Sequence, residues 1–195
     1  MQILIKESIE QSIDVKKKLL KHCSQTILDS AIILVEAIKS GKKILTCGNG
    51  GSAADSQHLA AELVIRYRSN VNRPAIPAIA LTVDPSISTA GGNDIGFENV
   101  FSRCTEAYGQ EGDCLIAIST SGNSENVFRA IQTAKEKNMK TIGLLGSDGG
   151  RIAKICDISV IVPSNITARI QEAHILIAHI WCEIIEELLY KDFIK

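Results

Sequence analysis

Five short apolar runs alternate with helical stretches after residue 41, and this alternation restricts the chain to few folds. Each run is bounded by Gly, Asp, Asn or Pro, as buried strands are, and the runs read KKILTC, PAIALTV, DCLIAIS, MKTIGLLG and ISVIVP. Parallel neighbours need crossover connections, and these are right-handed. The β-α-β-α order therefore predicts an α/β fold with a doubly wound, five-stranded parallel sheet flanked by helices.

Helical patterns also occupy both ends of the chain. Ile5, Ile9 and Ile13 recur at helical spacing, and Gly41 is suited to end that segment. A last helix is expected from about residue 167 to 189, and its wide apolar surface indicates packing between subunits. We expect one domain over residues 1–195, with N-terminal helices in 1–40 and the α/β core and C-terminal helix in 42–195.

The composition excludes several classes of function. Lys and Arg number 21 against 22 Asp and Glu, for a formal net charge of -1, and aromatic residues make up 4%. A nucleic-acid-binding protein needs a clustered basic surface or stacking side chains, so no nucleic-acid partner is expected. Charged residues or His interrupt every long apolar run, and Lys6 and Glu7 interrupt the first ten residues. We therefore expect no membrane span, no signal peptide and a cytoplasmic location.

Two loops that follow predicted strands have the composition of an anion site. Gly48-Asn49-Gly50-Gly51-Ser52 follows the first strand, Ser119-Thr120-Ser121-Gly122-Asn123-Ser124 follows the third, and each leads into a helix. Ligands bind at the carboxyl ends of parallel strands, and N–H groups and hydroxyls at a helix N-terminus attract phosphate. One serine could be a simple helix cap. Four hydroxyls in six residues exceed that need, so the second loop, the hydroxyl loop, is predicted to bind phosphate.

The first loop allows another interpretation. Gly48, Gly50 and Ala53 fit a relaxed dinucleotide fingerprint, and Asp84 ends the next predicted strand, where a ribose-binding acid would lie. However, Asp84 lies well beyond the expected spacing of about 20 residues, and a nucleotide site would leave the hydroxyl loop unexplained. A P-loop is excluded because no Gly-Lys-Ser/Thr follows the glycines.

His58 and Glu62 stand four residues apart in the helix after the first loop, so both project from one face. Such a pair beside an anion site can be two metal ligands or an acid-base pair, although an isolated pair is ordinarily a surface contact. Small apolar neighbours favour a cavity here.

The last helix adds three candidate ligands whose spacing leaves their roles open. Spacing alone does not choose between His174 and His179. Gln171 and His179 are eight residues apart, about 12 Å along a helix axis, so one ion could hardly take both from one helix. A site that contains both is therefore expected to be completed by helices of different subunits.

Several segments together resemble one family, the phosphoheptose isomerases of the SIS (sugar isomerase) domain superfamily, which have a flavodoxin-like sheet. The segments are GNGGSAADSQHLAAEL, GGNDIGF, ISTSGNSENV, DGG and ARIQEAHILIAHIWCEIIE, and the resemblance covers about residues 26–190. It implies an isomerase that interconverts sedoheptulose 7-phosphate and glycero-manno-heptose 7-phosphate through an enediol, the first step towards ADP-heptose for lipopolysaccharide core or capsule. It also implies a homotetramer with active sites between subunits, each holding one zinc ion.

The resemblance further implies roles for individual residues. The metal ligands would be His58, Glu62, Gln171 and His179. The substrate contacts would be Asn49, Gly50, Gly51, Ser52, Glu62, Asn93, Asp94, Ser119, Thr120, Ser121, Ser124 and Gln171. For the enediol chemistry, the hypothesis is that Glu62 abstracts the carbon proton, His179 manages the oxygen proton and zinc polarises the carbonyl.

A non-catalytic alternative comes from the same superfamily. A binding protein resembling the DnaA initiator-associating protein would share the loops, but that relative lacks counterparts of the carboxylate and the terminal histidine. The presence of Glu62 and His179 favours an enzyme. A sugar-phosphate-sensing regulator would carry an attached DNA-binding domain, for which 195 residues are expected to leave no room.

Overall fold

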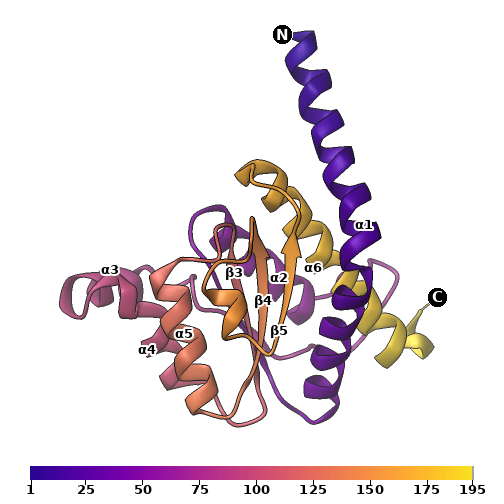
Figure 1. The fold of residues 1–195 in the computed structure, drawn as a ribbon. Coiled ribbons are helices and arrows are strands. Elements are labelled where there is room, and N and C mark those ends of the chain that lie inside the picture. The colour runs from indigo at the N-terminus through magenta and orange to yellow at the C-terminus, as the bar shows by residue number, and fades with distance from the viewer. Residues whose placement is uncertain (195) are drawn as a thin grey trace.

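A five-stranded parallel sheet forms the centre of the computed structural model, which describes residues 1–194 (Figure 1). Its strands are β1 (Ile44–Cys47), β2 (Ala78–Ala80), β3 (Cys114–Ser119), β4 (Lys140–Gly146) and β5 (Ile158–Val162), in the order β2-β1-β3-β4-β5. The order reverses between β1 and β3, where Cys47 pairs with Ala117. The first loop and the hydroxyl loop therefore leave the sheet side by side, at the switch point where doubly wound sheets bind ligands.

Helices cover both faces of the sheet, as the sequence predicts. The helices are α1 (Gln2–Lys39), α2 (Gly51–Val64), α3 (Pro85–Asp94), α4 (Val100–Tyr108), α5 (Glu125–Glu136) and α6 (Thr167–Leu189), with short 3-10 turns at 97–99, 152–154 and 191–193. Alternate strand residues point to opposite faces. Ile116 packs in the core under α1, α2 and α6, whereas Leu115 packs in the core under α4 and α5.

Helix α3 is an element that the sequence interpretation missed, and it corrects the role considered for Asp84. The Asp84 carboxylate accepts hydrogen bonds from the backbone N–H groups of Ser86 and Ile87, at 2.8 and 3.0 Å. Pro85 occupies the first turn, where its missing N–H costs nothing. Asp84 is thus a helix N-cap, and its interpretation as a ribose-binding acid is wrong.

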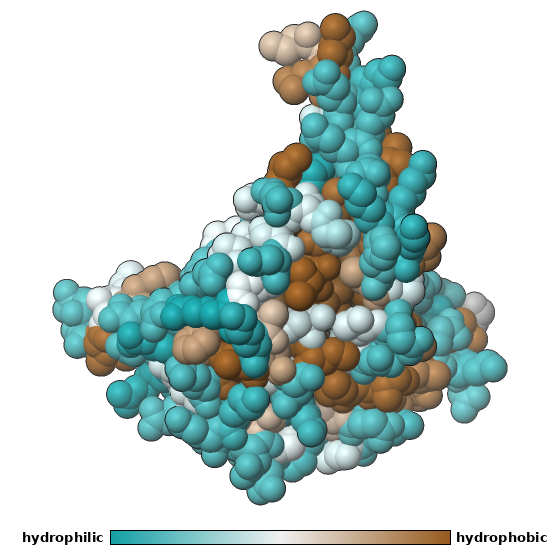
Figure 2. All heavy atoms as spheres, viewed as in Figure 1, coloured by the Kyte–Doolittle hydropathy of each residue, from teal (hydrophilic) through white to brown (hydrophobic). Residues whose placement is uncertain are grey.

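Residues 2–39 form one continuous helix rather than several, and its first part extends away from the sheet (Figures 1 and 2). Buried residues of α1 begin only at Val15, while Ile3, Ile5, Ile9 and Ile13 are all exposed. Of these, Ile5, Ile9 and Ile13 recur every four residues and form one apolar row along the helix, which is exposed to solvent in the described chain. Within residues 1–194, no helix is both long and apolar enough to cross a membrane.

Candidate active site

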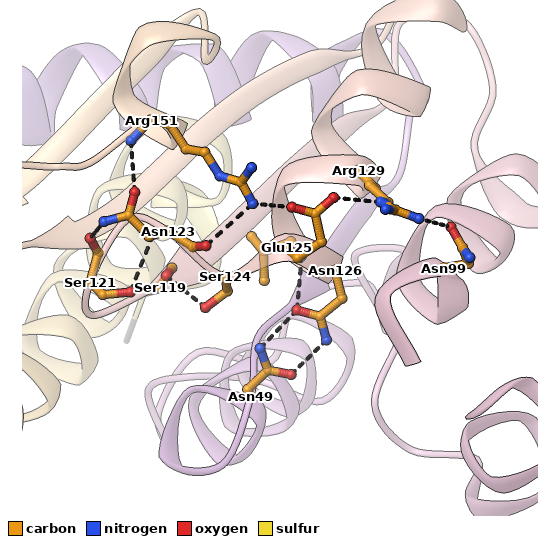
Figure 3. A network of polar contacts seen from close by, with 11 residues as sticks. Asn49, Asn99, Ser119, Ser121, Asn123, Ser124, Glu125, Asn126, Arg129 and Arg151 are labelled. Atoms are coloured by element: carbon orange, nitrogen blue, oxygen red, sulfur yellow. Dashed lines mark hydrogen bonds and ion pairs between the residues drawn. The ribbon is translucent and has the colours of Figure 1, made fainter. Parts of the chain in front are cut away.

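The first loop is held between α5 and α6. The amide groups of Asn49 and Asn126 pair through two hydrogen bonds of 2.9 and 2.8 Å (Figure 3). A Cβ atom on Gly51 would lie 2.3 Å from Nε2 of Gln171, so the Gln171 side chain rests directly on the start of α2. Asn126 is a contact that the sequence interpretation missed. Ser52, a predicted substrate contact, is only 2% exposed, whereas Gly50 and Gly51 beside it are exposed.

The hydroxyl loop closes tightly before α5 (Figure 3). The hydroxyl oxygens of Ser119 and Ser124 lie 3.0 Å apart, and the Asn123 backbone N–H donates to Oγ of Ser121 at 3.2 Å. Gly122 has a φ of +65°, and a Cβ atom there would lie 2.0 Å from the carbonyl oxygen of Gly149. Because two backbones touch at Gly122, the loop is packed firmly where it enters the 12-residue helix α5, whose N-terminal N–H groups can attract phosphate.

This packing predicts the effect of adding one methyl group at Gly122. Gly122→Ala should lower the free energy of unfolding by at least about 2 kcal/mol, because the left-handed backbone and the contact with Gly149 both oppose a side chain. Chemical denaturation measures this loss. Gly92→Ala is the matched control, since a Cβ there meets nothing within 4 Å, and equal stability of the two variants would contradict the prediction.

An ion-pair chain beside the hydroxyl loop was not foreseen from the sequence (Figure 3). The Glu125 carboxylate pairs with the guanidinium groups of Arg151 and Arg129, the latter at 2.6 Å, and Arg129 also donates to Oδ1 of Asn99 at 2.6 Å. Hydrogen bonds from Arg151 and then Arg129 lower the pKa of Glu125. The negative charge of Glu125, which directly follows the hydroxyl loop, is therefore balanced by two guanidinium groups.

His58, Glu62 and His179 converge at a second point of the site. Nε2 of His58 lies 3.1 Å from Nε2 of His179 and 3.0 Å from Oε1 of Glu62. One nitrogen or oxygen atom from each side chain lies within 4.8 Å of the others, which makes the three a possible metal-binding group. The predicted pairing of His58 with Glu62 is confirmed, and α6 supplies the third member. Gln171, two turns earlier on α6, lies over Gly51 instead.

His174 has a structural role, which the spacing could not decide. It is 0% exposed, and its Nε2 donates to the carbonyl of Leu145 at 3.0 Å. Its Nδ1 is buried without a hydrogen-bond partner among residues 1–194. Burial lowers the pKa of His174 to about 4, so the folded protein keeps this ring neutral. His179 is consequently the histidine of α6 that reaches the site.

The lowered pKa of His174 predicts a pH-dependent contribution to stability. In the unfolded chain the His174 ring has its ordinary pKa of 6.5 and binds a proton below that pH. In the folded protein the same ring stays neutral until about pH 4. The free energy of unfolding should therefore fall by about 1.4 kcal/mol per pH unit across this window as pH is lowered. His174→Gln can donate the same hydrogen bond without titrating, so unfolding of the two proteins at pH 7 and pH 4.5 isolates this contribution. Parallel pH dependences would contradict it.

Asp55 is a further group near the site that the sequence interpretation passed over. It lies on α2 one turn before His58, and its Oδ2 is buried without a hydrogen-bond partner in the described chain. Burial raises the pKa of Asp55 to about 6, against a smaller lowering by His58. Asp55 is therefore a carboxyl group with a raised pKa, one helical turn from His58.

Asn93 and Asp94 lie apart from the rest of the predicted site. They end α3, their side chains hydrogen bond to each other at 2.7 Å, and both are exposed. Helix α3 projects sideways from the body of the molecule (Figure 1). Each of its residues is at least partly exposed in the described chain. One copy of the chain does not bring these two side chains to the hydroxyl loop.

The sequence and the fold both match known proteins. A model of the SIS domain family matches residues 9–146, and the chain is therefore a SIS domain protein. The phosphoheptose isomerases of Chlorobaculum parvum and Clostridium acetobutylicum are each 52% identical to it, over 187 and 194 residues. These matches cover 95% of this chain and 90% of the first relative, and 98% of both chains for the second.

A solved structure gives the same assignment. The phosphoheptose isomerase of Neisseria gonorrhoeae superimposes with a TM-score of 0.89 at 42% identity, over 95% of this chain and 98% of that chain. The chain belongs to the phosphoheptose isomerases, and with this the expected enzyme class is confirmed over the non-catalytic alternative.

Proposed function

We propose that this protein interconverts sedoheptulose 7-phosphate and glycero-manno-heptose 7-phosphate, supplying heptose for lipopolysaccharide core or capsule. The convergence of His58, Glu62 and His179 supports this proposal most directly. Conversion of a ketose to an aldose moves a proton between adjacent carbons through an enediol, so it needs a base at carbon and an acid-base group at oxygen. A carboxylate and an imidazole held 4.8 Å apart or less can supply both.

The two ends of the substrate would be held by different elements. We assign removal of the carbon proton to Glu62, whose side chain is 23% exposed, and exchange of the oxygen proton to His179. Ser119, Thr120, Ser121 and Ser124 would bind the phosphate at the N-terminus of α5, while Asn49, Gly50, Gly51 and Gln171 would contact the sugar, with Ser52 left buried within α2. Binding energy from the remote phosphate can then position the reacting carbons.

The convergent group fits a zinc ion, which we propose as the cofactor, one per site. Ligand atoms around a tetrahedral zinc ion stand about 3.3 Å apart, and the contacts of 3.0 and 3.1 Å at His58 Nε2 approach this separation. Two imidazoles and a carboxylate are also ligands that zinc prefers. Bound there, zinc would polarise the substrate carbonyl. Gln171 is the proposed fourth ligand, and it would have to leave Gly51 or come from another subunit.

We further propose that the enzyme is a homotetramer of single SIS domains in the cytoplasm, with each active site between subunits. Two features of the chain support an assembly: the exposed apolar row of α1, and α3, whose residues all keep exposed surface within the described chain. A neighbouring copy could carry Asn93 and Asp94 to the sugar. Light scattering on the purified protein should give the mass of four chains, and the mass of one chain would contradict the proposal.

Incubation of the purified protein with sedoheptulose 7-phosphate tests the reaction. The aldose 7-phosphate should appear in the NMR spectrum, whereas sedoheptulose without phosphate should react far more slowly, because the hydroxyl loop then contributes no binding. Absence of product together with tight binding to a replication initiator protein would favour the non-catalytic alternative.

A further inference from the structure

Arg73 is buried and hydrogen bonds to the C-terminal end of α2, the helix that carries Glu62. Its Nη2 donates to the backbone carbonyl of Glu62 at 2.7 Å, and its Nη1 donates to the carbonyl of Leu63 at 2.9 Å. These carbonyls belong to the last turn of α2, where no following helical N–H can bond to them. One guanidinium therefore fixes the backbone beneath Glu62, at the helix end that favours a positive charge.

Glu186 connects the same guanidinium to the helix that carries His179. Oε1 of Glu186 accepts from Nε of Arg73 at 3.1 Å and from the backbone N–H of Tyr67 at 3.2 Å, and Oε2 accepts from Nε of Arg68 at 2.9 Å. The side chain of Arg73 is 1% exposed and that of Glu186 is 0% exposed. Glu186 follows His179 by seven residues, two helical turns, so both lie on one face of α6.

We propose that Arg73 and Glu186 are positioning residues of the isomerase, which hold α2 and α6 in the register that brings Glu62 to His179. A buried ion pair contributes little to the free energy of unfolding compared with apolar side chains of the same volume. The role we assign to this pair is therefore to fix the positions of α2 and α6 relative to each other. The two terminal nitrogens of the Arg73 guanidinium donate to backbone carbonyls of α2, while its Nε pairs with the Glu186 carboxylate of α6. This inference rests on the roles proposed above for Glu62 and His179.

Arg73→Lys and Glu186→Gln test the pair, because each retains much of the side-chain volume but loses part of the connection. We expect kcat to fall about 10- to 100-fold and zinc affinity, measured without substrate by competition with a chelating dye, to weaken by a similar factor. KM for the phosphosugar should change less than about threefold, because the hydroxyl loop lies on other elements. Glu186→Gln repeats the measurement if Arg73→Lys fails to fold.

Asp113→Asn is the matched control for loss of a buried ion pair. Asp113 is 2% exposed and pairs with Lys43 at the opposite end of the sheet, where β3 begins. This control should lower the melting temperature but leave kcat and zinc affinity unchanged. If the Arg73 and Glu186 variants behave like this control, the positioning role is wrong. If the wild type lacks isomerase activity, the proposed function fails, and the zinc affinities still decide whether the pair positions the two helices.

Discussion

Replacing Glu62 by Gln is expected to lower kcat by about three orders of magnitude or more. The amide keeps the size of the carboxylate, whose Oε1 lies 3.0 Å from Nε2 of His58, but it cannot accept a proton from carbon. Phosphate affinity should stay nearly unchanged, because the hydroxyl loop and the N-terminus of α5 do not depend on Glu62. Steady-state kinetics and competition by inorganic phosphate measure the two effects separately.

Two further measurements make the Glu62 result interpretable. Glu136→Gln makes the same chemical change at an exposed position of α5 and should leave turnover as in the wild type. Zinc content separates the two roles of Glu62: loss of turnover with zinc retained identifies the base, and loss of both identifies the ligand. Wild-type turnover in Glu62→Gln would contradict both roles.

Removal of the metal is the second change with a large expected effect. Dialysis against a strong chelator should reduce activity at least about 100-fold, and stoichiometric zinc should restore it, since a Lewis acid contributes several kcal/mol to stabilising developing charge. His58→Ala should lose activity that zinc cannot restore, because it removes the nitrogen closest to both Glu62 and His179.

The control for metal removal is a histidine outside the site. His22 is exposed on α1, and His22→Ala should keep both zinc content and full recovery after chelation. Full activity of the chelated wild type, with zinc shown to be absent, would contradict the proposed cofactor.

Local patterns in the sequence predict most of the fold. Apolar runs bounded by turn residues locate the strands, and the switch point between β1 and β3 brings together the two loops that small and hydroxyl residues had marked. Helix α3 was missed because Gly91 and Gly92 interrupt it and because Ile87 and Ala90, its two apolar residues, are too few to show a helical period. The signal that could have found it was Asp84 followed by Pro85, a cap before a first-turn proline.

The remaining parts of the site depend on contacts between distant segments. His174 and His179 have similar neighbours in sequence, and contacts with distant segments distinguish them: His174 donates to the carbonyl of Leu145 on β4, whereas His179 contacts His58 on α2. The Arg73–Glu186 pair joins residues 113 positions apart. Such contacts depend on how the helices pack on the sheet. The spacing of residues within one segment does not predict that packing.

The most direct test of the central claim is an approach to equilibrium from both sides. Purified wild-type protein is given sedoheptulose 7-phosphate in one sample and glycero-manno-heptose 7-phosphate in another, and NMR follows both. An isomerase must bring the two samples to one common ratio of ketose to aldose, with no other product. Two unchanged substrates, or conversion to any other sugar phosphate, would contradict the account.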